Sequence, residues 1–168
     1  MLTDLVQIRR LGEQKREENF RFRAHLKRHD HSDRRLRRLA EEIEAQIDCT
    51  LCANCCRVPE VGITDRDVEK LSKFYGVTPQ EFHRDYTERN ETNELILKRT
   101  EAGCVFLSGN LCTVYEARPR NCATFPHLIR GDGSIASRMW AMVDRAAYCP
   151  IVYNWMEAAK QELGFRGR

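Results

Sequence analysis

Four of the eight cysteines in this 168-residue chain fall within eight consecutive residues, and this run constrains the fold more than any other feature. The run consists of Cys49, Cys52, Cys55 and Cys56, and the other four cysteines come singly at Cys104, Cys112, Cys122 and Cys149. Buried structural thiols are usually isolated residues, so they do not account for this density. Cysteines at intervals of three residues are typical metal ligands. We therefore expect the later cysteines to converge with the first four around bound metal.

The spacing within the run favours an iron–sulfur cluster. A zinc site usually takes two separated pairs of ligands, whereas here a third cysteine follows at the same interval. Such a run is typical of bacterial ferredoxins, in which it holds a [4Fe–4S] cluster and the last cysteine is followed by proline. The dipeptide Cys149-Pro150 provides such a cysteine. Zinc is the alternative, because zinc clusters also use dense cysteine.

Cys55 and Cys56 are neighbours, and neighbouring side chains point away from each other along most backbones. We expect these two cysteines to serve two centres, or one to bind metal while the other packs or reacts. Eight cysteines divide into two sets of four, but the sequence does not assign the sets.

Disulfides and redox chemistry are the competing interpretations of the cysteines. The N-terminus lacks the order of a secretory signal, and outside oxidising compartments a cysteine cluster is more often metal-binding or catalytic than disulfide-bonded. A thioredoxin-like CxxC would need a βαβ context that the pattern lacks. No apolar run approaches the roughly 20 residues of a membrane span. We expect a cytoplasmic protein whose thiols stay reduced.

Residues 1–48 contain no proline and a single glycine, and they are rich in Arg, Glu, Leu and Lys. This composition predicts a helical hairpin or one long broken helix, with a turn at residues 29–33 and Ser32 or Asp30 as the next N-cap. We expect residues 1–48 to be a helical N-terminal extension and residues 49–168 to be the cysteine-cluster metal-binding domain.

The second part of the chain carries clear helix starts. Thr64 with Asp67 forms a capping-box pattern, and Thr78-Pro79 with Glu81 forms another. Residues 103–107 and 111–115 flank a glycine-containing turn, which predicts a hairpin with Cys104 and Cys112 on paired strands. A last helix is expected at about residues 150–163. The predicted fold class is α+β and mostly helical, with a small metal-centred domain, a short β-hairpin and a C-terminal helix.

Residues 21–38 carry eight Arg or Lys against two Asp, which indicates either a patch for an acidic partner or an ordinary solvated helix face. We favour the solvated face, and the net charge of +3 is too small to indicate a nucleic-acid partner. His25 and His29 lie four residues apart, but no HExxH motif is present, so we interpret them as surface histidines. The partner is an unknown protein or small molecule, and the N-terminal helices offer a surface for oligomerisation.

The chain resembles the YkgJ-type cysteine-cluster family, a zinc- or iron-chelating domain with the signature CxxCxxCC, then CxFL…C…Y, then RPxxC…FP, then CP. The matching residues lie at about 49–150 and comprise Cys49, Cys52, Cys55, Cys56, Cys104, Phe106, Leu107, Cys112, Tyr115, Arg118, Pro119, Cys122, Phe125, Pro126, Cys149 and Pro150. The chain departs from the family pattern at Ala53, Ala123 and Ile151. The ligand set survives these departures, but a substrate role for an arginine at position 123 does not carry over.

The resemblance implies metal binding by the cysteines. It also points to flagellin lysine-N-methylase, an enzyme with this cysteine domain and an iron–sulfur cluster, although no glycine-rich nucleotide loop or methyl-donor domain is present in these 168 residues. Three functions are open. They are an enzyme acting at an open iron site, a zinc-binding structural or metal-handling protein that binds a partner through its basic extension, and an electron carrier.

For the enzyme, Arg118, Arg120 and His127 are candidate cofactor- or substrate-binding groups near Cys122. The sequence does not identify a catalytic residue. It also leaves open whether the chain is an enzyme at all.

Overall fold

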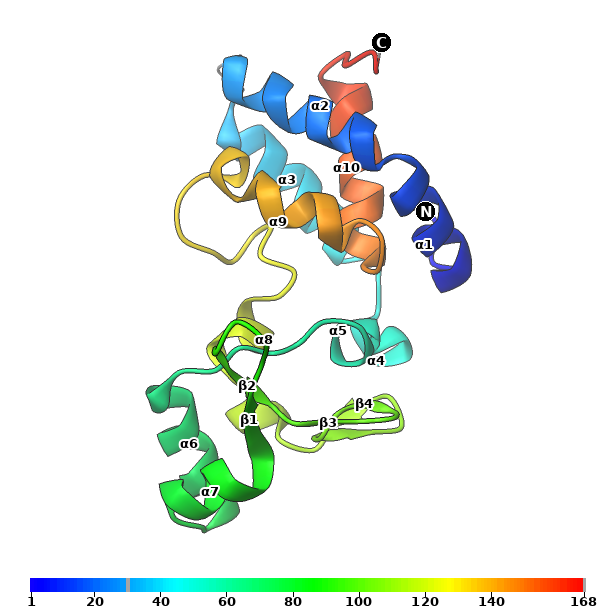
Figure 1. The fold of residues 1–168 in the computed structure, drawn as a ribbon. Coiled ribbons are helices and arrows are strands. Elements are labelled where there is room, and N and C mark those ends of the chain that lie inside the picture. The colour runs from blue at the N-terminus through cyan, green and yellow to red at the C-terminus, as the bar shows by residue number, and fades with distance from the viewer. Residues whose placement is uncertain (30, 168) are drawn as a thin grey trace. The chain divides into compact units, whose positions relative to one another are not determined.

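The computed structural model describes residues 1–29 and 31–167, and over these residues the chain is mostly helical with three short antiparallel strand pairs (Figure 1). The predicted mostly helical α+β class is therefore confirmed. The chain forms two compact units. We call Met1–Asp48 with Pro126–Arg168 the helical unit, and Cys49–Phe125 the cysteine unit.

The two units divide the chain differently from the predicted domains. Both divisions place a boundary after Asp48, but residues 126–168 were assigned to the cysteine-cluster domain and instead pack with the N-terminal helices. The reason is that the C-terminal helix buries its apolar stripe against the helix that ends at Glu44.

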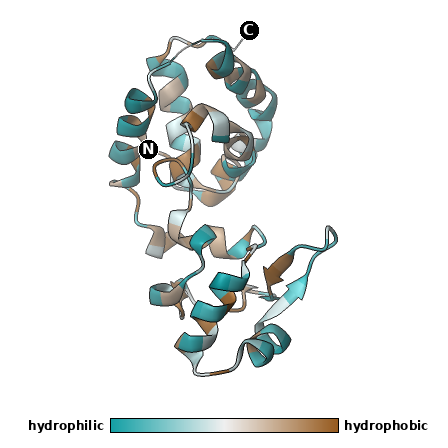
Figure 2. Cartoon of the chain, turned by 90° about the vertical axis from the view of Figure 1, so that its left-hand side faces the viewer, coloured by the Kyte–Doolittle hydropathy of each residue, from teal (hydrophilic) through white to brown (hydrophobic). Residues whose placement is uncertain are grey.

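The helical unit contains five helices among its described residues. They are α1 (Leu5–Gln14), α2 (Arg16–Arg28), α3 (Asp33–Glu44), α9 (Ile135–Arg145) and α10 (Pro150–Glu162). Helix α2 packs on α9, and α10 packs on α3. In Figure 2 these helices carry both hydrophilic and hydrophobic residues along their length, as amphipathic helices around a shared core do.

The C-terminal helix forms as the sequence predicts. Pro150 occupies its first turn, where the missing amide hydrogen is not needed, and Cys149 is its N-cap residue. One face of this helix, formed by Val152, Trp155, Met156 and Ala159, is buried. The indole Nε1 of Trp155 also donates to the carbonyl of Leu36 at 3.0 Å, which fixes α10 on α3.

The described part of residues 1–48 forms the three helices α1, α2 and α3, where the sequence predicted a hairpin or one broken helix. Ser32 is the N-cap residue of α3, as one of the two alternatives predicted, and Asp30 lies outside the described residues. Three arginines of the basic stretch form ion pairs within the unit. Arg35 pairs with Glu162, Arg37 with Asp33, and Arg38 with Glu42.

The cysteine unit is built from short elements. Its helices are α4 (Cys49–Cys52), α5 (Asn54–Arg57), α6 (Asp65–Tyr75), α7 (Pro79–Tyr86), the 3₁₀ helix η1 (Tyr115–Ala117) and α8 (Arg120–Thr124). Its strands are β1 (Thr87–Arg89), β2 (Leu95–Leu97), β3 (Arg99–Thr100), β4 (Gly103–Cys104), β5 (Leu107–Ser108) and β6 (Leu111–Cys112). Both predicted capping boxes are present, at Thr64 with Asp67 and at Thr78 with Glu81.

The predicted hairpin at residues 103–115 is wrong in its pairing. Cys104 on β4 pairs with Arg99 on β3, and Cys112 on β6 pairs with Leu107 on β5. The two cysteines therefore lie on separate strand pairs. The turn within β5–β6 is also shorter than expected, because Ser108 pairs with Leu111 and only Gly109 and Asn110 lie between them.

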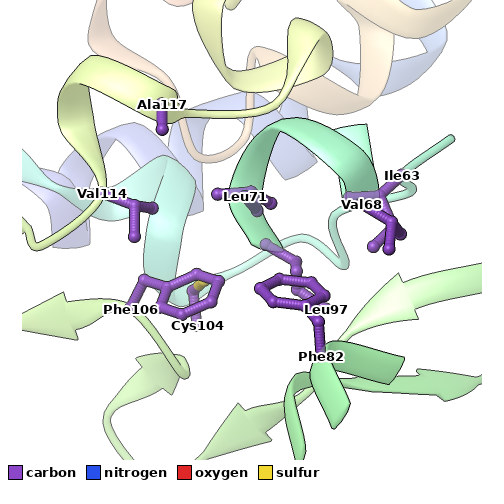
Figure 3. Packing of buried hydrophobic residues seen from close by; sticks show 9 residues of the cluster. All are labelled: Ile63, Val68, Leu71, Phe82, Leu97, Cys104, Phe106, Val114 and Ala117. Carbon is purple, nitrogen blue, oxygen red and sulfur yellow. The ribbon is translucent and has the colours of Figure 1, made fainter. Parts of the chain in front are cut away.

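The core of the cysteine unit is a compact cluster of aliphatic and aromatic side chains (Figure 3). Its buried members are Ile63, Val68, Leu71, Phe82, Leu97, Cys104, Phe106, Val114 and Ala117. Phe82, Tyr86 and Phe106 pack with ring centroids 5.0–6.1 Å apart. Cys56 and Cys112 are partly buried and pack against the same cluster, so these two cysteines border the apolar core.

None of the described helices combines the length and the apolar character needed to cross a bilayer.

Candidate metal centre

The thiols of four cysteines gather in the cysteine unit. Cys56 comes from α5, Cys104 from β4, Cys112 from β6 and Cys122 from α8. They lie close enough that Cys56 acts on the pKa of each of the other three, and Cys112 acts on those of Cys104 and Cys122. We call this set the four-thiol cluster. Its members are up to 66 residues apart in the chain, from 56 to 122.

A glycine allows β4 to approach α5. Gly103 has a φ of +129°, a conformation that only glycine adopts readily. A Cβ atom at this position would lie 2.5 Å from the carbonyl oxygen of Cys56. The absence of a side chain at position 103 therefore places Cys104, the next residue, beside the backbone of Cys56.

Two hydrogen bonds hold α8, and with it Cys122, against the start of α6. The backbone amide of Arg120 donates to Oδ1 of Asp67 at 2.9 Å. Nδ2 of Asn121 donates to the carbonyl oxygen of Gly62 at 2.7 Å. Asp67 is also the acid of the α6 capping box, so one buried carboxylate serves both elements.

Arg57 ties the cysteine run to the β5–β6 turn. Its guanidinium donates to the carbonyl oxygen of Cys52 at 2.9 Å, and to the carbonyl oxygen of Gly109 and Oδ1 of Asn110 at 2.7 Å each. Asn110 returns a bond from Nδ2 to the carbonyl oxygen of Leu51 at 3.2 Å. The turn before Cys112 is thus fixed to the helices that carry Cys52 and Cys56.

Burial sets the ionisation of three of these thiols. It raises the pKa of Cys104 and of Cys112, and it raises that of Cys122 to about 12, with the neighbouring thiols adding to the effect. The pKa of Cys56 is lowered to about 7, mainly by a hydrogen bond with the Cys55 thiol. At neutral pH the cluster therefore combines one thiol near its pKa with three that hold their protons.

Three arginines face the four-thiol cluster. Arg57 lowers the pKa of Cys56, Arg99 lowers that of Cys104, and Arg118 lowers those of Cys112 and Cys122, each as a minor contribution from its positive charge. Arg99 also donates to the carbonyl oxygens of Pro59 and Arg57. The sequence analysis missed Arg57 and Arg99. The position of Arg57 directly after Cys56 was an available signal, and Arg99 offered none.

The other four predicted ligands are placed differently. Cys49 and Cys52 stand at the two ends of α4, and Cys55 follows in α5 after Ala53, whose left-handed φ of 49° separates the two short helices. Cys49 is exposed, while Cys52 and Cys55 are half-buried. Cys149 is buried in the helical unit at the N-terminus of α10. Their role as ligands stays a prediction.

The predicted cofactor-binding residues do not form one group within a unit. Arg118 lies 3.9 Å from the ring centroid of Tyr115 and near the thiols of Cys112 and Cys122. Arg120 is exposed and uses its backbone amide to bind Asp67. His127 belongs to the helical unit, where it has a φ of 66° and its carbonyl oxygen accepts from Nε of Arg138 at 2.8 Å.

The donor chemistry of the four-thiol cluster fits a metal ion or an iron–sulfur cluster, both of which are held by four cysteine thiolates. Cys56, Cys104, Cys112 and Cys122 all carry free thiols. As they stand, the described residues include no group of three or more His, Cys, Asp or Glu side chains that could hold a metal ion. Binding thus requires these thiols to lose protons and move together, which is the usual coupling of metal binding to folding.

No solved structure matches this chain. A family model does match, over residues 48–150, and its description is "CxxCxxCC: Putative zinc- or iron-chelating domain". The matched segment contains all eight cysteines and the signature residues on which the resemblance was based. The chain therefore belongs to the CxxCxxCC family of zinc- or iron-chelating domains.

Proposed function

We propose that the cysteine unit binds a metal centre through Cys56, Cys104, Cys112 and Cys122, and that this centre is a [4Fe–4S] cluster. The observation that supports it best is the convergence of four thiols from four separate elements. Four thiols with no bound cation gain little from such proximity, because Cys56, Cys104 and Cys112 each raise the pKa of Cys122. A metal cation bound among these thiols would instead lower their pKa values, since metal-bound thiols are deprotonated.

The arginines support an anionic metal centre. Four thiolates carry four negative charges, which exceed the charge of one zinc ion and of the common [4Fe–4S] core. The positive charges of Arg57, Arg99 and Arg118, which lie on the surrounding elements, offset part of the remaining negative charge. Charge and hydrogen bonding around the sulfurs are among the factors that set the reduction potential of an iron–sulfur cluster.

The run Cys49, Cys52 and Cys55 supports iron over zinc. Its three thiols lie on α4 and α5 in the same unit, and the Cys55 thiol is hydrogen-bonded to that of Cys56. A second set of thiols at ferredoxin-like spacing is typical of iron–sulfur proteins, whereas a single structural zinc needs only four ligands. When bound, an iron–sulfur cluster would supply electron transfer or a Lewis-acidic iron.

An enzyme that modifies a substrate at an open iron position is a second candidate. It is favoured by Arg118, which is half-buried beside the thiols of Cys112 and Cys122 and could bind an anionic group there. Adding candidate cofactors to the anaerobic protein tests this candidate. A change in the visible spectrum supports an open iron position, and an unchanged spectrum excludes it for those cofactors.

The experiment that tests the main proposal is anaerobic purification followed by iron, zinc and acid-labile sulfide analysis. We expect a brown protein with iron and sulfide in equal amounts. Stoichiometric zinc without sulfide would leave the thiol ligands in place and reverse the choice of metal. A protein without either metal would contradict the proposal altogether.

The variant Cys104→Ser tests whether the four-thiol cluster is where the metal binds. Cys104 is buried in the cluster, and losing a ligand should release most of the metal and destabilise the cysteine unit, since binding and folding are coupled. Leu111→Ser is the matched control, because Leu111 is 62% exposed and precedes Cys112 in the same strand. It should keep its metal. If both variants retain the parent's metal content, the centre lies elsewhere.

A further inference from the structure

Three histidines of the helical unit come together at the end of α2. His25 lies in the last turn of this helix, His29 is its C-cap residue, and His31 follows in the connection to α3. Nε2 of His31 lies 3.2 Å from Nε2 of His25. The ring centroids are 4.4 Å apart for His25 and His29, 5.1 Å for His25 and His31, and 5.9 Å for His29 and His31.

The separation of His25 and His31 matches that of two imidazoles bound to one ion. A metal–nitrogen bond of about 2.0–2.1 Å in a tetrahedral site places two donor nitrogens about 3.3 Å apart and two ring centroids about 5 Å apart. The Nε2–Nε2 distance of 3.2 Å agrees with the first value. The three centroid distances, 4.4–5.9 Å, bracket the second.

Without a metal, only part of this arrangement is explained. One N–H···N hydrogen bond accounts for the contact of His25 with His31. It does not explain why the His29 ring lies tilted against both other rings.

The three histidines are open to solvent on one side and packed against aromatic rings on the other. His29 is exposed, and His29 and His31 line a cavity of about 680 Å³ whose walls include Asp33, Ser134 and Ser137. On the inner side, His25 packs against the ring of Phe165 at 5.3 Å and that of Phe22 at 6.4 Å. Lys27 and Arg28 also line the cavity, but both are exposed, so solvent screens their repulsion of a cation.

We propose that His25, His29 and His31 form a binding site for a divalent transition-metal ion of the zinc, nickel and copper class, which prefers imidazole ligands. The described residues do not yet present three donors to one point, so the His29 side chain must turn towards the other two rings. The exposure of His29 leaves room for this turn. The site lies in the helical unit and uses none of the cysteines, so it does not depend on the proposed metal centre.

Cobalt(II) is the probe, added to the anaerobically purified full chain with its cysteine-bound metal in place. Equilibrium dialysis counts the additional ions. We expect one, without the near-ultraviolet charge-transfer band of thiolate-bound cobalt, and with paramagnetic broadening of the ring-proton NMR signals of the three histidines. An additional ion with a thiolate band, or no additional ion, overturns the proposal.

Variants His29→Ala and His31→Ala test the assignment. Even changes beside a ligand cost about 10–100-fold in metal affinity, so losing a ligand should cost at least about 100-fold. His83→Ala is the control, because His83 lies on α7 in the other unit beside Thr87. It should bind cobalt like the parent. Helicity measured by circular dichroism establishes that the variants fold, and for folded variants an unchanged affinity overturns the proposal.

Discussion

Gly103 decides how closely two candidate ligands can approach. Its φ of +129° and the 2.5 Å between a hypothetical Cβ and the carbonyl oxygen of Cys56 make this position intolerant of any side chain. The consequence goes beyond local strain, because Cys104 is the next residue and lies in the core of the unit. Backbone conformation at one residue thus positions the ligands before any metal is bound.

We predict that Gly103→Ala lowers both stability and metal content. The strained conformation and the clash with backbone atoms should together cost at least about 2 kcal/mol. Gly109→Ala is the matched control: its φ is +59°, but nothing lies within 4 Å of a Cβ built there. That change should cost about 1 kcal/mol and leave the metal in place. Urea unfolding and metal analysis of both variants measure this, and equal losses would contradict the role assigned to Gly103.

At the scale of elements, hydrogen bonds at helix ends connect one helix to another. Asp33, the first residue of α3, accepts from the backbone amide of Ile135 at 2.6 Å and from Nε of Arg37 at 2.5 Å. It therefore links α3 to the first residue of α9. Burial alone would raise the pKa of Asp33, but the hydrogen bonds from Arg37 and Ile135 outweigh it and the pKa is lowered.

This link predicts a pH dependence of stability. Because the folded pKa of Asp33 is depressed, its contribution is present above the unfolded value, 3.8, and is lost as the pH falls through the folded value. Asp33→Asn should cost about 1–2 kcal/mol at pH 7 and progressively less below about pH 4. Asp65→Asn, at the first residue of α6, is the control for loss of charge at a helix start. A cost for Asp33→Asn that stays constant from pH 7 to pH 3 would contradict this assignment.

The elements also show what the sequence could predict. The helices beginning after Thr64 and Thr78 were predicted with their caps because the capping residues are three positions apart and act locally. The strand pairs failed because β3 to β6 have two residues each, too few for an alternating pattern to fix the register. The pairing of Cys104 with Arg99 depends instead on packing against α5.

At the scale of the whole molecule, the sequence predicted that the chain is a zinc- or iron-chelating domain, but it did not predict which cysteines share a metal centre. The whole signature at residues 49–150, from the Cys49–Cys56 run to Cys149-Pro150, predicted the family. Which cysteines share a centre depends on contacts between residues as distant as Cys56 and Cys122, and spacing along the chain carries no information about them. The expectation that the Cys55 and Cys56 side chains point apart is wrong, because their thiols are hydrogen-bonded. Whether they serve two centres, or one binds metal while the other packs or reacts, stays a prediction.

The central claim is that Cys56, Cys104, Cys112 and Cys122 bind one metal centre together. Thiol alkylation mapped by mass spectrometry, on the anaerobic full chain before and after a chelator removes iron and zinc, tests it most directly. We predict that these four cysteines resist alkylation while metal is bound and become reactive together once it is removed. If they become reactive independently, or react equally with and without the chelator, they do not share a metal centre.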